Sequence, residues 1–394
     1  MKTGRAVLVL LLMGSAAHGA EKSVLVTPSR FTTSHLTNRQ ADSILAGSWR
    51  VLRVNHKPGD RPCPVRFIRA EGVTTFSTGD GSIDSFAELD AVEALPGGVK
   101  VVNQLNWCGR VSPNFLGCAR IPSSSFTVVR ISVMEDILWA HEYGHTRGLH
   151  HRNDRNAVMN PFLTPTMRKV TSAECAKFRS SSTGRTEDPA TPAAPVDIRT
   201  FVSRLYIHGV PYEEASRFDA ETTVPVLLAM LADPEEEQLW PNIVVTLGMI
   251  GDERAVEPLI EFLQQEVEGT LSHNHYIAKS SVVMSLGYVI NRTGSRRALD
   301  FLVESADPET WSHRSLFWAS PYHGTDAERD RQLATMSILG LGLSGHPEAA
   351  EVLRTLPGPA DVIDTALEAH RHIERMGLGA YYREELGRPE RQRN

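Results

Sequence analysis

The most constraining segment of this 394-residue chain reads HEYGHTRGLHH and runs from His141 to His151. In a helix of 3.6 residues per turn, His141 and His145 lie on one face, about 6 Å apart along the axis, so both imidazoles can reach one metal ion. Glu142 falls beside that face, where a carboxylate can contact a metal-bound water without being a ligand. Gly148 permits the left-handed turn that ends a helix, after which the chain can return with a third histidine.

Two histidines compete for the third metal position, His150 and His151. The spacing from Gly148 favours His151, and His150 is interpreted as a neighbouring or exposed ring. Three protein ligands leave the fourth position of a tetrahedral zinc ion to water, as in catalytic rather than structural zinc sites. The sequence therefore predicts one catalytic zinc ion, with His151 as its third ligand and Glu142 as the general base.

The residues after His151 resemble the zinc-binding stretch of metzincin peptidases. They read RNDRNAVMNP, with Met159 eight residues after His151 and Pro161 two residues further on, and this short gap is similar to the matrixin branch. The resemblance implies that Met159 forms an apolar floor beneath the ligands and that the segment around Pro161 forms a wall of the substrate pocket. Its specific part runs from Ile137 to Pro161. No tyrosine stands two residues after Met159 and Arg152 follows the third histidine, so substrate preference is not carried over.

The resemblance also implies an α+β fold for residues 21–180, a metzincin-like zinc peptidase domain with a twisted mixed sheet and long helices. Thr37 is placed to cap a helix that runs through Arg53 with apolar residues at helical spacing. Predicted strands, each bounded by Gly, Pro or Ser, are Val65–Ile68, Val73–Phe76, Val99–Leu105 and Phe126–Val133. Matrixins often bind structural calcium, but the acidic residues that invite this interpretation lack a calcium-loop motif, and a polar hairpin is predicted there. They are Asp80, Asp84 and Asp90.

The N-terminus predicts the compartment. Lys2 and Arg5 precede an apolar run and then small residues, which is the layout of a secretory signal peptide over residues 1–20. The rest of the chain has no apolar stretch long enough to cross a membrane. The protein is therefore expected to be secreted or periplasmic, with no membrane span.

The chain has four cysteines, all within the first 180 residues. An even number in an exported protein favours disulfides over free thiols. Cys108 and Cys118 flank a short loop that contains Gly, Pro and Asn, so they are predicted to pair. That pairing leaves Cys63 with Cys175.

The composition changes near residue 180. Residues 181–196 are polar and rich in proline and alanine, which is typical of a semi-extended linker. Residues 197–382 then carry a diffuse repeat in which an apolar helix ends near a glycine and an amphipathic helix follows. Its three copies are Thr246–Leu263, Ser285–Leu302 and Gly340–Leu353. This pattern is similar to HEAT repeats, whose helix pairs bury their apolar faces by stacking, and predicts an all-α repeat domain before a flexible tail at 383–394.

An aromatic insertion separates the second and third copies at residues 310–326. It is either a contact surface that projects from the repeats or a segment that packs over them. Its aromatic residues are Trp311, Phe317, Trp318 and Tyr322.

Three classes of function follow from these features. The favoured class is an exported zinc endopeptidase in which zinc activates water, Glu142 takes the proton, and the helical repeats recognise a protein or peptide substrate or another protein partner. The alternatives are a secreted repeat protein with an inert metal domain, against which the intact Glu142 argues, and a zinc hydrolase acting on a non-protein substrate. The net charge of −6 and the pI near 6.2 give no basic footprint for nucleic acid.

Overall fold

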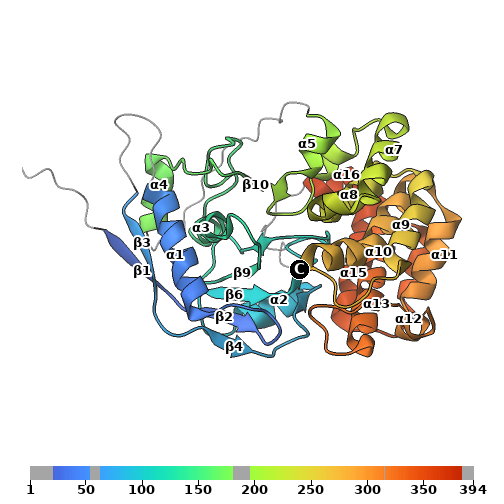
Figure 1. Cartoon of the computed structure of the whole chain (residues 1–394), viewed down its shortest axis with the longest axis horizontal. Coiled ribbons are helices and arrows are strands. Elements are labelled where there is room, and N and C mark those ends of the chain that lie inside the picture. The colour runs from blue at the N-terminus through green and yellow to red at the C-terminus, as the bar shows by residue number, and fades with distance from the viewer. Residues whose placement is uncertain (1–20, 54–62, 181–195, 315, 384–394) are drawn as a thin grey trace, which may run out of the picture.

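The computed structural model describes residues 21–53, 63–180, 196–314 and 316–383. The predicted signal peptide lies outside these residues, as does nearly all of the predicted linker and tail. More than half of the described residues are helical, and a part containing both helices and strands precedes a part built almost entirely of helices (Figure 1). The prediction of a mixed α and β chain with a helical repeat region is confirmed.

The central sheet has five strands in the order β4-β2-β6-β9-β8. The first four are parallel, and β8 is antiparallel to β9 at one edge, so the sheet is mixed as predicted. Smaller parallel pairs join β1 to β3 and β5 to β7, and an antiparallel pair joins β10 to β11. The strands are β1 (Lys22–Val26), β2 (Pro28–Phe31), β3 (Val65–Arg69), β4 (Thr74–Phe76), β5 (Ser82–Ile83), β6 (Val99–Val102), β7 (Gln104–Leu105), β8 (Gly117–Cys118), β9 (Phe126–Val129), β10 (Phe162–Leu163) and β11 (Leu205–Tyr206).

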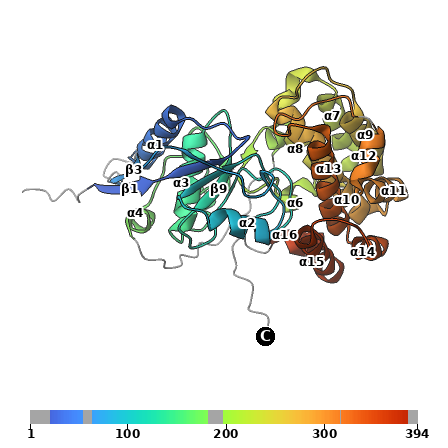
Figure 2. The same cartoon turned by 90° about the horizontal axis from the view of Figure 1, so that it is seen from below.

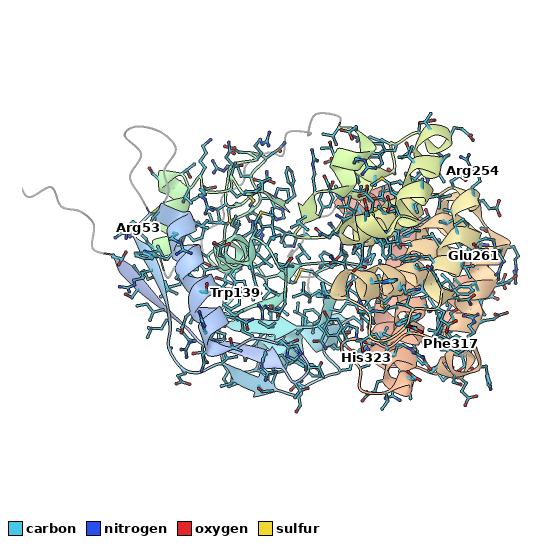
Figure 3. All side chains as sticks on the ribbon, viewed as in Figure 1. Arg53, Trp139, Arg254, Glu261, Phe317 and His323 are labelled. Carbon is cyan, nitrogen blue, oxygen red and sulfur yellow. A yellow bond between two sulfur atoms is a disulfide. The ribbon has the colours of Figure 1, made fainter. Side chains whose placement is uncertain are left out.

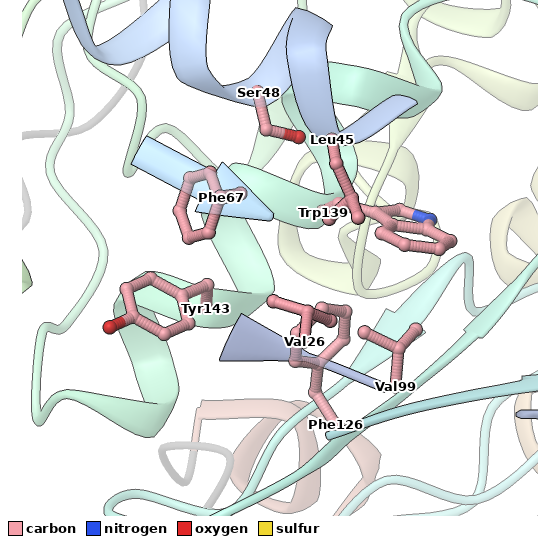
Figure 4. Close-up of a pocket in the computed structure, with 8 residues that line it drawn as sticks. All are labelled: Val26, Leu45, Ser48, Phe67, Val99, Phe126, Trp139 and Tyr143. Carbon is pink, nitrogen blue, oxygen red and sulfur yellow. The ribbon is translucent and has the colours of Figure 1, made fainter. Parts of the chain in front are cut away.

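Two helices pack against these strands and form the core of the mixed part. They are α1 (Asn38–Arg53) and α3 (Glu135–Thr146), which contact each other along their length. Thr37 accepts a hydrogen bond from the amide of Gln40 at 3.2 Å, as expected of a helix cap. Figure 4 shows the side chains between the helices and strands, where the remaining cavity has a volume of only about 10 Å³. This volume is at the lower limit for one water molecule, so the region is packed core.

The acidic segment around Asp84 differs from the predicted polar hairpin. It continues from β5 into α2 (Phe86–Glu93), and Asp84 itself is fully buried. Ser85 accepts a hydrogen bond from the amide of Glu88, whose carboxylate accepts one from the amide of Ser85. The prediction was wrong because this Ser-x-x-Glu capping box starts a helix where a turn between two strands was expected.

The cysteines pair as predicted. Cys63 is bonded to Cys175 with a Cα–Cα distance of 5.4 Å, and Cys108 to Cys118 at 5.7 Å. The first disulfide ties the chain near β3 to α4 (Ser172–Arg179), and the second closes the loop between β7 and β8. Both therefore stabilise segments around α3.

The helical part stacks pairs of helices beside the mixed part (Figures 1 and 2). The pairs α8/α9, α10/α11 and α13/α14 coincide with the three predicted repeat copies. Its helices are α5 (Ile198–Val202), α6 (Tyr212–Ala215), α7 (Ala220–Leu231), α8 (Trp240–Ile250), α9 (Val256–Gln264), α10 (His273–Thr293), α11 (Arg296–Ser305), α12 (Pro308–Arg314), α13 (Asp326–Ser344), α14 (Pro347–Leu353), α15 (Ala360–Met376) and α16 (Leu378–Arg383), with 3₁₀ turns at Pro234–Leu239 and Glu253–Ala255.

The repeated glycines let the first helices of neighbouring pairs approach closely. A β-carbon at Gly248 in α8 would lie 2.6 Å from the carbonyl oxygen of Ser285 in α10. A β-carbon at Gly287 in α10 would lie 2.2 Å from the carbonyl oxygen of Gly340 in α13. These glycines are packing positions inside the helices, whereas α8 and α10 end at Gly251 and at Gly294, which have positive φ.

The aromatic insertion packs onto the repeats through its tryptophans. Trp311 is fully buried and donates to the carbonyl of Ser305 at 2.7 Å, and Trp318 donates to the carbonyl of Leu263 at 3.0 Å. Phe317, by contrast, is 62% exposed and is labelled in Figure 3. Packing is therefore the correct interpretation for both tryptophans.

Candidate metal centre

Helix α3 holds the first three residues of the site. His141, Glu142 and His145 are buried, and the helix ends just before Gly148, which has a φ of 81°. This left-handed turn brings His151 back beside the helix, with its ring centroid 5.3 Å from that of His141. The local geometry is the one that the spacing of the segment predicted.

Four imidazoles meet at this point. Their ligand atoms all lie within 4.8 Å of one another, and the fourth belongs to His208. The Nε2 atom of His145 lies 3.0 Å from that of His141, 3.2 Å from that of His151 and 3.3 Å from that of His208. Zn–N bonds of about 2.0–2.1 Å in a tetrahedron place the nitrogens about 3.4 Å apart. The three distances from His145 are close to this spacing, and the wider spread of up to 4.8 Å requires small ring movements for all four nitrogens to bind one zinc ion.

Backbone carbonyls orient two of the rings. The Nδ1 atom of His141 lies 2.8 Å from the carbonyl oxygen of Val158, and that of His145 lies 2.8 Å from the carbonyl oxygen of Leu149. Nδ1–H donation to these oxygens leaves each Nε2 lone pair free for a metal. Burial lowers the pKa of His141 well below 6.5 and that of His145 to about 4. Both rings are therefore neutral at pH 7, the form that binds metals.

Glu142 lies beside the four histidines without being a member of the cluster. Its Oε1 atom is 3.8 Å from Nε2 of His208, and neither carboxylate oxygen has a hydrogen-bond partner among the described residues. Burial raises its pKa well above 4.5, and the charge of Glu93 adds to this. A β-carbon at Gly117 in β8 would lie 2.3 Å from Oε1, so this edge strand runs directly against the carboxylate.

The other predicted site residues lie close by. Met159 is buried, and its Sδ atom would lie 2.4 Å from a β-carbon at Gly144, so it packs against α3 between His141 and His145. The carbonyl oxygen of Pro161 accepts a hydrogen bond from the amide of Ile207 at 3.1 Å. His150, the alternative third ligand, is not in the cluster.

His208 is the residue that the sequence analysis missed. It lies in the part of the chain assigned to the helical repeats, 57 residues after His151, so no local spacing connects it with the other three. The available signal was weak: a single histidine inside the apolar run LYIHGV from Leu205 to Val210. Apolar runs are usually buried, and a buried histidine needs a partner such as a metal ion.

A comparison with protein families matches the PBS lyase HEAT-like repeat to residues 242–265, which extend from α8 through α9. No curated protein matches the chain. The match confirms the HEAT-like prediction for this segment, and repeats of this kind often mediate protein interactions. None of the described helices is both long and apolar enough to cross a membrane.

Proposed function

We propose that this protein is an exported zinc-dependent endopeptidase of the metzincin type, similar to the matrixins. One observation carries the proposal: the carboxylate of Glu142 is buried, and no described residue forms a hydrogen bond with it, beside four histidines whose geometry suits zinc. Burial of an unpaired carboxyl group costs free energy, and a purely structural zinc site does not require such a carboxyl group. Catalysis does require one, because a general base must contact a water molecule next to the metal.

The residues of the site divide the work of peptide hydrolysis. Bound zinc would acidify water and polarise a carbonyl group. Glu142 accepts the proton of the attacking water on a carboxylate oxygen and returns it to the nitrogen of the leaving amine. The carbonyl groups of Val158 and Leu149 keep His141 and His145 in the ligand orientation.

Export is part of the proposal. Two disulfides support it, since such bonds persist in oxidising compartments and are rare in the cytosol. The predicted signal peptide points to the same compartment. The HEAT-like repeats are proposed to bind a substrate protein or another protein partner.

A second candidate is a repeat protein whose metal site is only structural. The observation in its favour is the fourth imidazole, because four protein ligands close a tetrahedral zinc site. The two candidates differ in what they require of Glu142, which a structural site does not use.

The test measures peptide cleavage by the zinc-loaded protein, both in wild type and in the His208→Ala variant. The variant is included because the proposed mechanism needs a water ligand at the position that His208 takes. Glu142→Gln should keep stoichiometric zinc and lower turnover by roughly 10²- to 10⁴-fold. Glu135→Gln is the matched control, since Glu135 lies in the first turn of the same helix and pairs with Arg130. Stoichiometric zinc without cleavage of any peptide or protein, in both backgrounds, would contradict the proposal.

A further inference from the structure

The segment that carries His208 is extended and lies between two neighbours: the chain from Pro161 to β10 on one side and the chain at Leu116 and Gly117 on the other. We call residues 205–208 the cleft segment. On one side, Leu205 and Tyr206 form β11 and pair with β10, and the amide of Ile207 donates to the carbonyl of Pro161 at 3.1 Å. On the other side, the carbonyl of Ile207 accepts from the amide of Leu116 at 2.8 Å.

These main-chain contacts are those by which an extended peptide binds at the edge of a sheet. The amide of Gly117 in β8 also points to the carbonyl of Ile207, at 3.3 Å, and His208 bridges to Phe115 in antiparallel fashion. Gly117 is the residue that lies against Glu142. The cleft segment therefore occupies the edge next to the general base, where an extended substrate would need to lie.

Three of the four side chains of the cleft segment are buried as well, and that of Leu205 is partly buried. Ile207 is fully buried in the core of the mixed part, and His208 is only 7% exposed. The imidazole of His208 is directed at the other three, with its ring centroid 4.7 Å from that of His151. The following residue, Gly209, has a φ of 76° and turns the chain away from the site.

The helical part holds the chain just before the cleft segment. Asn242 of α8 donates to the carbonyl of Val202 at 3.0 Å and to that of Arg204 at 2.6 Å, and it accepts from Asn114 of the mixed part at 3.2 Å. Asn242 is also the first residue of the matched HEAT-like repeat. Asn242 therefore connects the repeats with the chain before the cleft segment and with the mixed part.

We infer that the cleft segment closes the metal site from within the chain: His208 fills the fourth metal position and residues 205–207 occupy the sheet edge beside it. The inference rests on the proposed function, for which it describes the regulation. The enzyme is latent in this conformation, and withdrawal of the cleft segment exposes the metal position, Glu142 and the sheet edge together. A partner that shifts α8 would act on the segment through Asn242.

The first test measures access to the metal without relying on cleavage. The full chain is loaded with Co²⁺, and visible spectra are recorded during titration with azide, a small anion that binds open metal positions. We compare wild type with His208→Ala and His208→Gln, and with His313→Ala as a control at an exposed histidine of α12. Circular dichroism and metal content confirm that each variant is folded and loaded.

Wild type and His313→Ala should need roughly 10- to 1000-fold more azide for the same spectral change, because only the open molecules bind it, whereas both His208 variants should show an altered spectrum and saturable azide binding at low concentration. Equal azide binding by wild type and the His208 variants would overturn the inference. So would loss of the metal from folded His208 variants, because the centre would then need all four ligands.

The second test measures cleavage of a fluorogenic peptide. A closed state that leaves 0.1–10% of molecules open predicts that His208→Ala raises turnover roughly 10- to 1000-fold. Asn242→Ala should raise turnover less, because His208 is still present and only the hydrogen bonds from Asn242 to the chain before the cleft segment are lost. Azide binding without any peptide cleavage, both in His208→Ala and in the double variant His208→Ala/Asn242→Ala that also loosens residues 205–207, would support the closure and contradict the proposed endopeptidase activity. Equal turnover of wild type and an active His208→Ala enzyme would overturn the closure.

Discussion

The backbone of Gly117 lies directly against the carboxylate of Glu142: a β-carbon at position 117 would be 2.3 Å from Oε1. This contact joins the edge strand β8 to α3, the helix that holds His141, Glu142 and His145. Since the carboxylate has no hydrogen-bond partner among the described residues, packing against β8 contributes to its position.

Gly117→Ala is therefore predicted to displace the carboxylate that we propose as the general base. A misplacement of about 1 Å costs roughly 10²-fold in rate, so turnover in the His208→Ala background should fall by about that factor while zinc content stays unchanged. Gly98→Ala is the control, because a β-carbon there meets its nearest neighbour at 3.9 Å, an ordinary contact. Unchanged turnover in Gly117→Ala would show that the carboxylate finds a productive position despite the added methyl group.

Gly144 and Met159 are predicted to be energetically coupled. Gly144→Ala forces a methyl group against the sulfur of Met159 and should destabilise the protein by about 1–3 kcal/mol. Met159→Ala removes the buried side chain and should cost about 2–5 kcal/mol. In the double variant the added methyl enters space that the sulfur has left, so the loss should be smaller than the sum by about 0.5–3 kcal/mol. Urea unfolding of the four proteins measures this coupling, and strictly additive losses would contradict it.

Local spacing explains which parts of the site were predictable. His141, His145 and His151 lie within 11 residues, and one helix with one glycine turn determines their meeting. His208 meets them through chain pairing between β10 and β11, on the far side of the predicted linker. A single sequence contains no periodicity that records such a contact.

The difference between local patterns and long-range contacts also explains which parts of the fold were predictable. The helix from Asn38 to Arg53 and the repeat helices follow their apolar periodicity, and the strands follow their β-branched runs. Asp84 lies in a polar segment that sequence patterns place at the surface, yet contact with Gln332 of α13 buries it. Burial at the contact between the two parts of the chain depends on the tertiary structure, which periodicity does not describe.

Gly287 is predicted to determine the spacing of α10 and α13. A β-carbon there would lie 2.2 Å from the carbonyl oxygen of Gly340, and backbone cannot rotate away as a flexible side chain does. Gly287→Ala should therefore lower the free energy of unfolding by about 1–3 kcal/mol. Gly324→Ala serves as the control, since its nearest contact would be 3.6 Å, to a side-chain oxygen of Glu328. Equal midpoints of thermal unfolding for both variants would contradict close packing of these helices.

Asp84 is predicted to make stability depend on pH. It is fully buried between the two parts of the chain, where it accepts hydrogen bonds from Asn106 at 2.6 Å and from Gln332 at 3.2 Å. Burial, with a further contribution from Asp80, raises its pKa from 3.8 to about 7. The neighbouring Glu88 is shifted in the same direction, to a pKa of about 9, again mainly by burial.

The sign of the effect follows from proton binding. Between pH 4 and 7 the folded protein keeps a proton on Asp84 that the unfolded chain has lost, so stability falls as pH rises, by at most about 1.4 kcal/mol per pH unit. Above pH 7 both states are ionised and the loss from Asp84 is complete. Asp84→Asn has no charge to bury, and Oε1 of Gln332, which has no hydrogen-bond partner in the described part of the chain, can accept from the new amide if the Gln332 side chain flips. The variant should therefore be more stable than wild type at pH 8, and between pH 5 and 7 it should lack the part of the slope that belongs to Asp84, while other buried groups such as Glu88 and Glu142 keep theirs. Urea unfolding at pH 5, 7 and 8 measures both, with Asp364→Asn on the exposed side of α15 as the control. Parallel pH profiles for wild type and Asp84→Asn would show that Asp84 ionises in the folded protein as it does in the unfolded chain.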